Sequence, residues 1–213
     1  QKVFAPVPTT DPLNKTISQS GSALLEKQYS DGYWRFDLEA DATIPSEYLF
    51  LQYFMGDVDR AREQRLAKYI ESRQMDDGSW PLYEAGSGNI SATVKSYLAL
   101  KLAGRDPASN LMKNARQWVL RHGGAESSNV FTRITLAVFG QMPWHTVPAM
   151  PAEIILLPKW FLFSLPKVSY WSRCVIVPLL ILFAKRPIHK LTQEQGISEL
   201  FIENPASLKH IDK

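Results

Sequence analysis

The chain is poor in cysteine and has no pattern of metal ligands. Cys174 is the single cysteine among 213 residues, which excludes an internal disulfide and a thiolate metal cluster. The four histidines are scattered and match no metal-ligand spacing. The sequence therefore predicts no metal and no other cofactor. For Cys174 itself, with no His or acid partner recognisable nearby, we expect a buried and inert thiol.

Net charge is also small, and it is unevenly placed. The chain has 24 Lys and Arg against 21 Asp and Glu, a formal net charge of +3, so nothing indicates a nucleic-acid partner. Residues 1–140 carry 16 basic and 16 acidic side chains, whereas residues 141–190 carry six basic side chains against Glu153 alone. The second region is also hydrophobic, and it is the one part of the chain with a local basic excess.

No uninterrupted apolar run is long enough to cross a bilayer. Six prolines divide residues 143–178 into apolar pieces far shorter than the roughly 20 residues that a spanning helix needs. Tryptophans and basic residues in the same region suit a segment that lies in one leaflet. A buried helix under an irregular loop and docking on a membrane surface both stay open. For docking, the residues expected to face lipid are Trp160, Phe161, Leu179, Leu180, Leu182 and Phe183.

A seven-residue motif occurs twice and indicates a structural repeat. Residues 28–34 read QYSDGYW and residues 74–80 read QMDDGSW, each after a helix-like segment and 46 residues apart. Gly permits a sharp turn, Asp caps it, and Gln and Trp can hydrogen bond and stack. We call each copy of this motif a clasp and expect it to join consecutive helices of a repeated helical hairpin. The repeated residues are Gln28, Gly32, Trp34, Gln74, Gly78 and Trp80.

Hydrophobic periodicity predicts an almost entirely helical protein. After a first helix at residues 17–28, apolar helices are expected at residues 45–55 and 90–102, and more polar ones at residues 58–73 and 108–121. Apolar helices that alternate with polar ones indicate two concentric layers. The expected fold class is therefore all-α, an α/α barrel that is incomplete in this chain.

Composition divides the chain into three expected segments. Residues 1–16 form an arm rich in Pro and Thr, and residues 17–190 form part of the barrel, with residues 143–190 as a membrane-facing apolar segment. Residues 191–213 are polar and are interpreted as a linker or an insertion. Repeats of this kind need about three copies for a stable body, so we expect the architecture to continue beyond this chain.

The ordered motifs resemble those of squalene-hopene cyclases, the bacterial class II triterpene cyclases. Besides the two clasps, the resemblance is carried by residues 43–48 (TIPSEY), 127–133 (SSNVFTR), 151–158 (PAEIILLP) and 170–173 (YWSR). It runs from about residue 17 to about residue 187. It identifies the chain with the N-terminal third of a longer enzyme built from two α/α barrels.

The resemblance implies an enzyme that cyclises squalene to hopene or hopanol by a proton-initiated carbocation cascade. The family's acid is the middle Asp of an Asp-x-Asp-Asp motif, which does not occur in this sequence. The nearest string, residues 57–60 (DVDR), ends in Arg and is interpreted as a helix cap with solvated charges. This part would form cavity wall and membrane attachment, and alone it is expected to be inactive.

The same resemblance implies partners and a location. The expected partners are squalene and a membrane surface, and a homodimer stays open. The expected location is peripheral or monotopic, on the cytoplasmic face of a bacterial inner membrane.

Particular positions match cavity residues of the family. Glu47 matches a cavity-floor carboxylate, and Phe131 and Trp171 match cavity aromatics, whose faces can stabilise a cation. Lys95 stands where some relatives place a second carboxylate, and Asn129 where they place arginine. The two departures compensate in charge, so we expect the polar network to be rewired rather than lost. The residues expected near the substrate channel are Val168, Cys174 and Ile176.

Other classes of protein remain open at this point. A glycan-processing α/α barrel needs two carboxylates in one cleft, for which Asp41 and Glu47 are the candidates. A protein prenyltransferase β-subunit shares the barrel but needs zinc ligands. The strongest rival is a noncatalytic, membrane-docked helical interaction module, because the chain lacks the acid.

Overall fold

A computed structural model describes residues 12–36, 39–148, 150–162 and 164–208. Within these ranges the secondary structure is helical, and the one β-bridge pairs Pro81 with Gly88 outside any strand. The predicted all-α class is therefore confirmed. The chain divides into two compact units, residues 1–39 and residues 40–213, which we describe separately.

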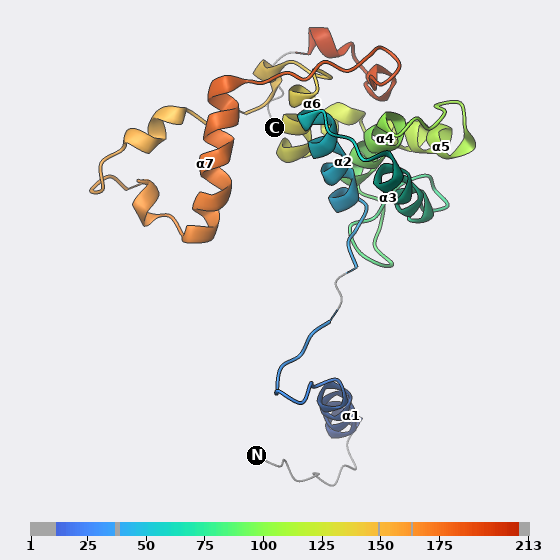
Figure 1. Ribbon diagram of the computed structural model, residues 1–213, viewed down its shortest axis with the longest axis vertical. Helices are drawn as coiled ribbons and strands as arrows, with labels where there is room; N and C mark the ends of the chain where they lie inside the picture. The colour runs from blue at the N-terminus through green and yellow to red at the C-terminus, as the bar shows by residue number, and fades with distance from the viewer. Residues whose placement is uncertain (1–11, 37–38, 149, 163, 209–213) are drawn as a thin grey trace. The chain divides into compact units, whose positions relative to one another are not determined.

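The first unit consists of helix α1 and the first clasp (Figure 1). Helix α1 spans Pro12–Glu26, and none of its residues is buried. After the helix, Trp34 Nε1 donates a hydrogen bond to the Leu24 carbonyl at 2.6 Å, and Gln28 Nε2 donates to the Gly32 carbonyl at 2.7 Å. The clasp thus ties the following chain back to the last turn of the helix.

The second unit has six α-helices among its described residues, and short 3₁₀ turns lie between α5 and α6, between α6 and α7, and after α7. Four of them, α2 to α5, correspond to helices that periodicity predicts, and their ends agree with the predicted ones to within about two residues. Their bounds are α2 Thr43–Met55, α3 Arg60–Ser72, α4 Ile90–Leu102, α5 Asn110–Arg121, α6 Val130–Val138 and α7 Tyr170–Lys185.

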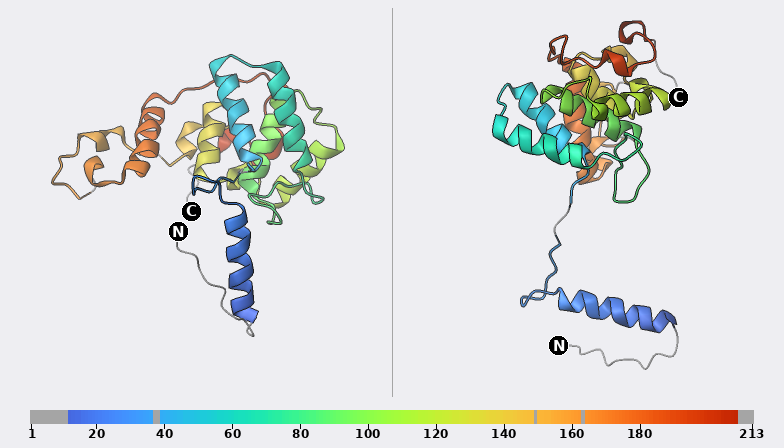
Figure 2. Two further views of the ribbon diagram at one scale, coloured as in Figure 1. Left: turned by 60° about the horizontal axis from the view of Figure 1, so that its bottom comes forward. Right: turned by 90° about the vertical axis from the view of Figure 1, so that its right-hand side faces the viewer.

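Helix α4 is the central helix of this unit. It contacts α2, α3, α5 and α6 (Figure 2), and 11 of its 13 residues are buried. Asn89 fixes its start, because the Asn89 Oδ1 accepts hydrogen bonds from the backbone of Ser91 and Ala92 at 3.0 and 3.1 Å. Helices α3 and α5 bury only three and four residues. The contrast follows the alternation of apolar and polar helices in the sequence.

The second clasp repeats the geometry of the first. Trp80 Nε1 donates to the Ile70 carbonyl at 2.7 Å, and Gln74 Nε2 donates to the Gly78 carbonyl at 2.9 Å. Gln74 also reaches the carbonyl of Leu111 in α5 at 3.0 Å. Trp80 is fully buried here. The second clasp therefore joins α3 to α5 as well as closing its own turn.

Asp77 adds a further link from the second clasp to α5. Its carboxylate accepts hydrogen bonds from the Ser79 backbone at 2.9 Å, from the Ser79 hydroxyl at 2.6 Å and from Trp118 Nε1 at 3.0 Å. Partial burial alone would raise the pKa of Asp77, but these hydrogen bonds favour the ionised form, and the net result is a lowered pKa.

Residues 191–208 pack onto the core of the second unit. The sequence is interpreted as a linker or an insertion here and gives no sign of this packing, because the apolar residues of the segment follow no regular period. Glu199 accepts a hydrogen bond from the Tyr97 hydroxyl at 2.9 Å and pairs with Lys101, which anchors the segment to α4. The buried apolar side chains are Ile197, Leu200, Phe201 and Leu208.

The proline-rich region forms three 3₁₀ turns followed by helix α7. The turns are Trp144–Thr146, Ala152–Leu156 and Leu165–Lys167. Helix α7 continues through Pro178, so the prediction that this proline interrupts the apolar run is wrong. A proline inside a helix removes one backbone hydrogen bond but leaves the other turns in place. Among the described residues, no helix is long and apolar enough to cross a membrane.

Helix α7 presents part of its apolar surface to the protein. Leu180 and Phe183 are 3% and 8% exposed, and Leu179 and Leu182 are half-buried against the core. The Phe183 ring meets the edge of Trp144 at a centroid distance of 6.3 Å. The prediction that Leu180 and Phe183 face lipid is therefore wrong, since protein atoms cover them. For the half-buried Leu179 and Leu182 it stays a prediction. The other two residues predicted to face lipid, Trp160 and Phe161, are exposed.

Candidate functional site

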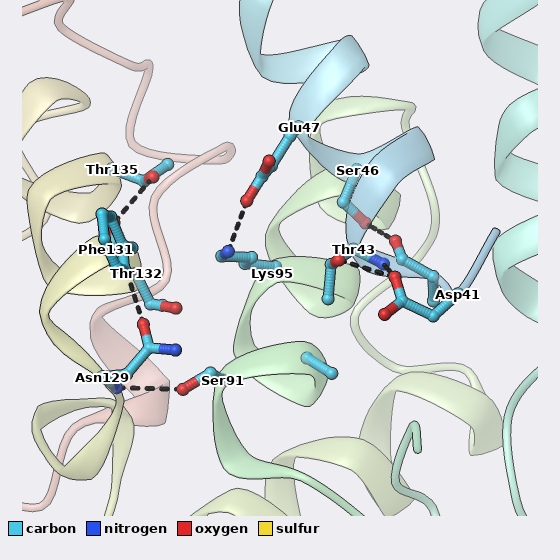
Figure 3. A network of polar contacts seen from close by, with 12 residues as sticks. Asp41, Thr43, Ser46, Glu47, Ser91, Lys95, Asn129, Phe131, Thr132 and Thr135 are labelled. Carbon is cyan, nitrogen blue, oxygen red and sulfur yellow. Dashed lines mark hydrogen bonds and ion pairs between the residues drawn. The ribbon is translucent and has the colours of Figure 1, made fainter. Parts of the chain in front are cut away.

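Four of the predicted cavity positions lie in one region of the second unit. Helices α2, α4 and α6 bring Glu47, Lys95, Asn129 and Phe131 together, as Figure 3 shows. These positions are separated by up to 84 residues in the chain, so their grouping depends on how the three helices pack.

Glu47 and Lys95 form an ion pair between α2 and α4. The Lys95 Nζ is joined to Glu47 Oε1, with side-chain exposures of 8% for Lys95 and 48% for Glu47. A buried ammonium group is costly unless it has a partner, and Glu47 supplies that partner while staying half in contact with solvent. The charge of the buried Lys95 is thus neutralised by the neighbouring carboxylate.

The start of α2 is fixed by local hydrogen bonds, which sets the position of Glu47. Asp41 Oδ1 accepts from the Thr43 backbone at 2.8 Å and from the Thr43 hydroxyl at 2.6 Å. The Ser46 hydroxyl donates to the Ala42 carbonyl at 2.6 Å. Asp41 is therefore occupied in an Asx-type turn at the start of the helix. This role argues against Asp41 as half of a catalytic carboxylate pair.

Asn129 caps α6 and attaches it to α4. Its Oδ1 accepts from the Thr132 backbone at 2.9 Å, and its own backbone N–H donates to the Ser91 hydroxyl at 2.9 Å. Among the described residues, the hydrogen-bond partners of Asn129 include neither Glu47 nor Lys95. Lys95 and Asn129 therefore belong to separate contacts, a lysine–glutamate pair and a helix cap. That the network is rewired relative to the family stays a prediction.

The predicted aromatic positions are on the surface of this chain. Phe131 on α6 is 55% exposed, and Trp171 at the start of α7 is 77% exposed. Of the predicted channel residues, Val168 and Ile176 are half-buried, and Cys174 is exposed. The prediction of a buried thiol is therefore wrong: α7 is apolar on all sides, and the sequence does not show which side meets the core.

Sequence reasoning missed a buried polar cluster between α2 and α3. Glu63 is 1% exposed and accepts from the Tyr53 hydroxyl at 2.6 Å and from Arg60 at 2.9 Å. Burial is the main reason that the pKa of Tyr53 is raised. Because α3 is strongly charged, its sequence indicates solvent exposure and gives no signal that one carboxylate is inside.

The string at residues 57–60 behaves as the sequence predicts. Asp59 is the N-cap of α3, and its Oδ1 accepts a hydrogen bond from the Arg62 backbone at 3.0 Å. This backbone hydrogen bond is the main cause of the lowered pKa of Asp59. The interpretation of the string as a helix cap is confirmed. In the part of the chain that the structure describes, no group of three or more His, Cys, Asp or Glu could hold a metal ion.

Comparisons with known proteins agree with the motifs. A family model described as the squalene-hopene cyclase N-terminal domain matches residues 17–213. The chain is 44% identical over 196 residues to a squalene-hopene cyclase of Zymomonas mobilis, covering 92% of this chain and 30% of the relative.

More distant relatives give the same picture. A squalene-hopene cyclase of Alicyclobacillus acidocaldarius is 33% identical over 187 residues, covering 88% of this chain and 30% of the relative. A dammaradiene synthase of Dryopteris crassirhizoma is 35% identical over 191 residues, covering 90% and 28%. The chain thus spans about 30% of the length of the curated relatives it matches.

Proposed function

The chain belongs to the squalene-hopene cyclase family as an N-terminal domain, and on this basis we propose that it is part of an enzyme that cyclises squalene to hopene or hopanol. In this proposal the protonating acid is supplied by another part of the protein, and the cascade proceeds through carbocations. These 213 residues contribute a wall of the substrate cavity and a surface that attaches to a membrane.

One observation carries the cavity-wall proposal. Lys95 of α4 pairs with Glu47 of α2, and Phe131 on α6, which packs on α4, is exposed; all three stand at positions that match family cavity residues. An aromatic face stabilises a passing cation without bonding to it. The Lys95 ammonium group occupies one oxygen of the Glu47 carboxylate, so that oxygen is not free to take a proton from a cation. We propose that this pair reduces proton abstraction by Glu47 from the final cation.

The membrane proposal is supported by exposed apolar side chains within the basic region. Besides Trp160 and Phe161, these are Ile155, Leu156, Leu162, Tyr170, Trp171 and Ile181. Lys159 and Lys167 lie in the same stretch, and cationic side chains attract anionic lipid headgroups. We propose that residues 155–171 rest on the cytoplasmic face of a bacterial inner membrane as a peripheral or monotopic attachment.

The function can be tested with a chimera. The chimera is the Zymomonas mobilis cyclase in which these 213 residues replace the matching N-terminal part. The purified chimera incubated with squalene should form pentacyclic products detectable by gas chromatography with mass spectrometry, whereas the 213-residue chain alone should form none. Products from the isolated chain, or a folded chimera without products, would contradict the proposal.

Membrane attachment needs a separate test at exposed positions. Trp160→Glu combined with Leu162→Glu should abolish co-sedimentation of the chain with anionic liposomes, because both side chains are more than 70% exposed and lie beside the basic residues. Tyr83→Glu is a matched control, since Tyr83 is 71% exposed but lies outside the basic region. Equal liposome binding by all three proteins would refute the docking surface.

A further inference from the structure

Arg133 in α6 is a buried cation without a partner among the residues that the structure describes. The residue is 3% exposed, and its Nε is enclosed with no hydrogen-bond acceptor. No hydrogen bond or ion pair reaches its guanidinium group from any residue that the structure describes. Burial lowers the pKa of Arg133 because the charged form loses contact with water. An arginine nevertheless stays protonated in a protein, so the charge remains.

The other buried charged residues of this unit are paired, which makes Arg133 an exception. Lys95 is joined to Glu47, and Glu63 is joined to Arg60. Thr132, the neighbour of Arg133, is fully buried, and its hydroxyl also lacks a partner. A buried polar group without a partner loses its water hydrogen bonds and gains nothing in return. Two successive residues of α6 thus have polar groups for which the described part of the chain supplies no partner.

We propose that Arg133 forms an ion pair with a carboxylate side chain from a part of the longer protein outside these 213 residues. The inference rests on the proposed function, because it requires the remainder that the relatives possess. A planar guanidinium group matches a carboxylate through two parallel hydrogen bonds. The Nε is the enclosed nitrogen of this group, so the two Nη nitrogens are the ones that a carboxylate from elsewhere would reach.

The inference predicts that one substitution has opposite effects in two proteins. In the isolated chain, Arg133→Met replaces an unpaired buried charge with an apolar side chain of similar size. The melting temperature should therefore rise by on the order of 5 °C. In the chimera, the same change leaves the partner carboxylate buried and alone, so the melting temperature should fall by a similar amount. A rise in both proteins would overturn the inference.

Three controls complete the experiment. Arg62→Met should have little effect in either protein, since the Arg62 side chain is 48% exposed. Arg133→Lys keeps the charge and should recover part of the loss in the chimera, and failure to recover any would contradict a charge pair. If acetate stabilises the chimera but not its Arg133→Met variant, Arg133 is still unpaired in the longer protein, the ligand is a free carboxylate, and a side chain as the source is ruled out.

Stability and product formation report on different claims. A chimera that shows the reversal but forms no product contradicts the proposed function and supports the ion pair. A chimera that forms product, and whose stability rises with Arg133→Met, supports the function and contradicts the ion pair.

Discussion

The second clasp should not tolerate any side chain at Gly78. Its backbone has φ +91°, a left-handed conformation that costs a residue with a Cβ about 1–2 kcal/mol. A Cβ built at Gly78 would lie 2.7 Å from both the carbonyl carbon and the carbonyl oxygen of Asn114 in α5. These are backbone atoms, so they cannot move aside as a flexible side chain would. We therefore expect a steric cost in addition to the conformational one.

Gly104 provides a matched control for this clash. It has φ +80°, and a Cβ there would meet nothing within 4 Å. Gly104→Ala should therefore lower the free energy of unfolding by only about 1–2 kcal/mol, the conformational cost. Gly78→Ala adds overpacking, which typically costs about 1–3 kcal/mol, so its total should be about 2–5 kcal/mol.

Urea unfolding followed by circular dichroism measures both changes. The midpoint should shift while the dependence on urea stays constant, because neither variant changes the area exposed on unfolding. The difference between the two variants isolates the contact with α5. If Gly78→Ala costs no more than Gly104→Ala, the close approach of the clasp to α5 is refuted.

Three further predictions concern hydrogen bonds and charges. Trp80→Phe leaves the carbonyl of Ile70 without its side-chain partner and should cost about 1–3 kcal/mol in urea unfolding, and a cost near zero would contradict the clasp geometry. Glu47→Gln leaves the buried ammonium group of Lys95 without its charged partner, whereas Lys95→Met leaves a carboxylate that water can reach. Glu47→Gln should therefore be the more destabilising of the two variants in the same assay. The pKa of Asp77 is lowered in the folded state, so the stabilisation by its ionised form is present above the unfolded pKa near 4 and is lost as the pH falls through the folded pKa. Asp77→Asn should therefore make the free energy of unfolding depend less on pH in that acid range. An unchanged dependence on pH would contradict this.

The helices of the second unit are largely predictable because local signals agree. The helix expected at residues 90–102 is α4 with the same bounds, and it begins after the Asn89 cap and ends before a glycine in the left-handed region, Gly104. Helices α2, α3 and α5 follow from the same kind of periodic pattern. Propensity, capping and hydrophobic pattern act over a few residues, so the sequence alone carries them.

The orientation of α7 is not predictable in this way. Helix α7 is apolar on nearly every side, and periodicity gives no preferred face for such a helix. Packing against Trp144 selects Phe183 as an inward residue, and this contact spans 39 residues. The same missing information accounts for the wrong prediction of burial for Cys174.

The ion pair shows what sequence reasoning can and cannot supply for the site. The resemblance indicates that Lys95 and Asn129 compensate in charge, and it suggests a connected network. It does not indicate that Lys95 pairs with Glu47, 48 residues earlier, while Asn129 serves as a helix cap. Partners at this separation are set by the packing of α2 on α4, which no local pattern records.

Helix α6 carries two successive polar residues that are buried without partners. Among the described residues, the Thr132 hydroxyl and the Arg133 Nε have no hydrogen-bond partner, and Phe131 just before them is exposed. In α3 and α4, by contrast, the buried charged residues have their counterions within the chain. The proposed function leaves the exposed Phe131 ring to the substrate, whereas the buried Arg133 cation requires an anion, so neighbouring residues of the same helix require different contacts. Helix α6 is therefore where we expect the remainder of the longer protein to make its most specific contacts.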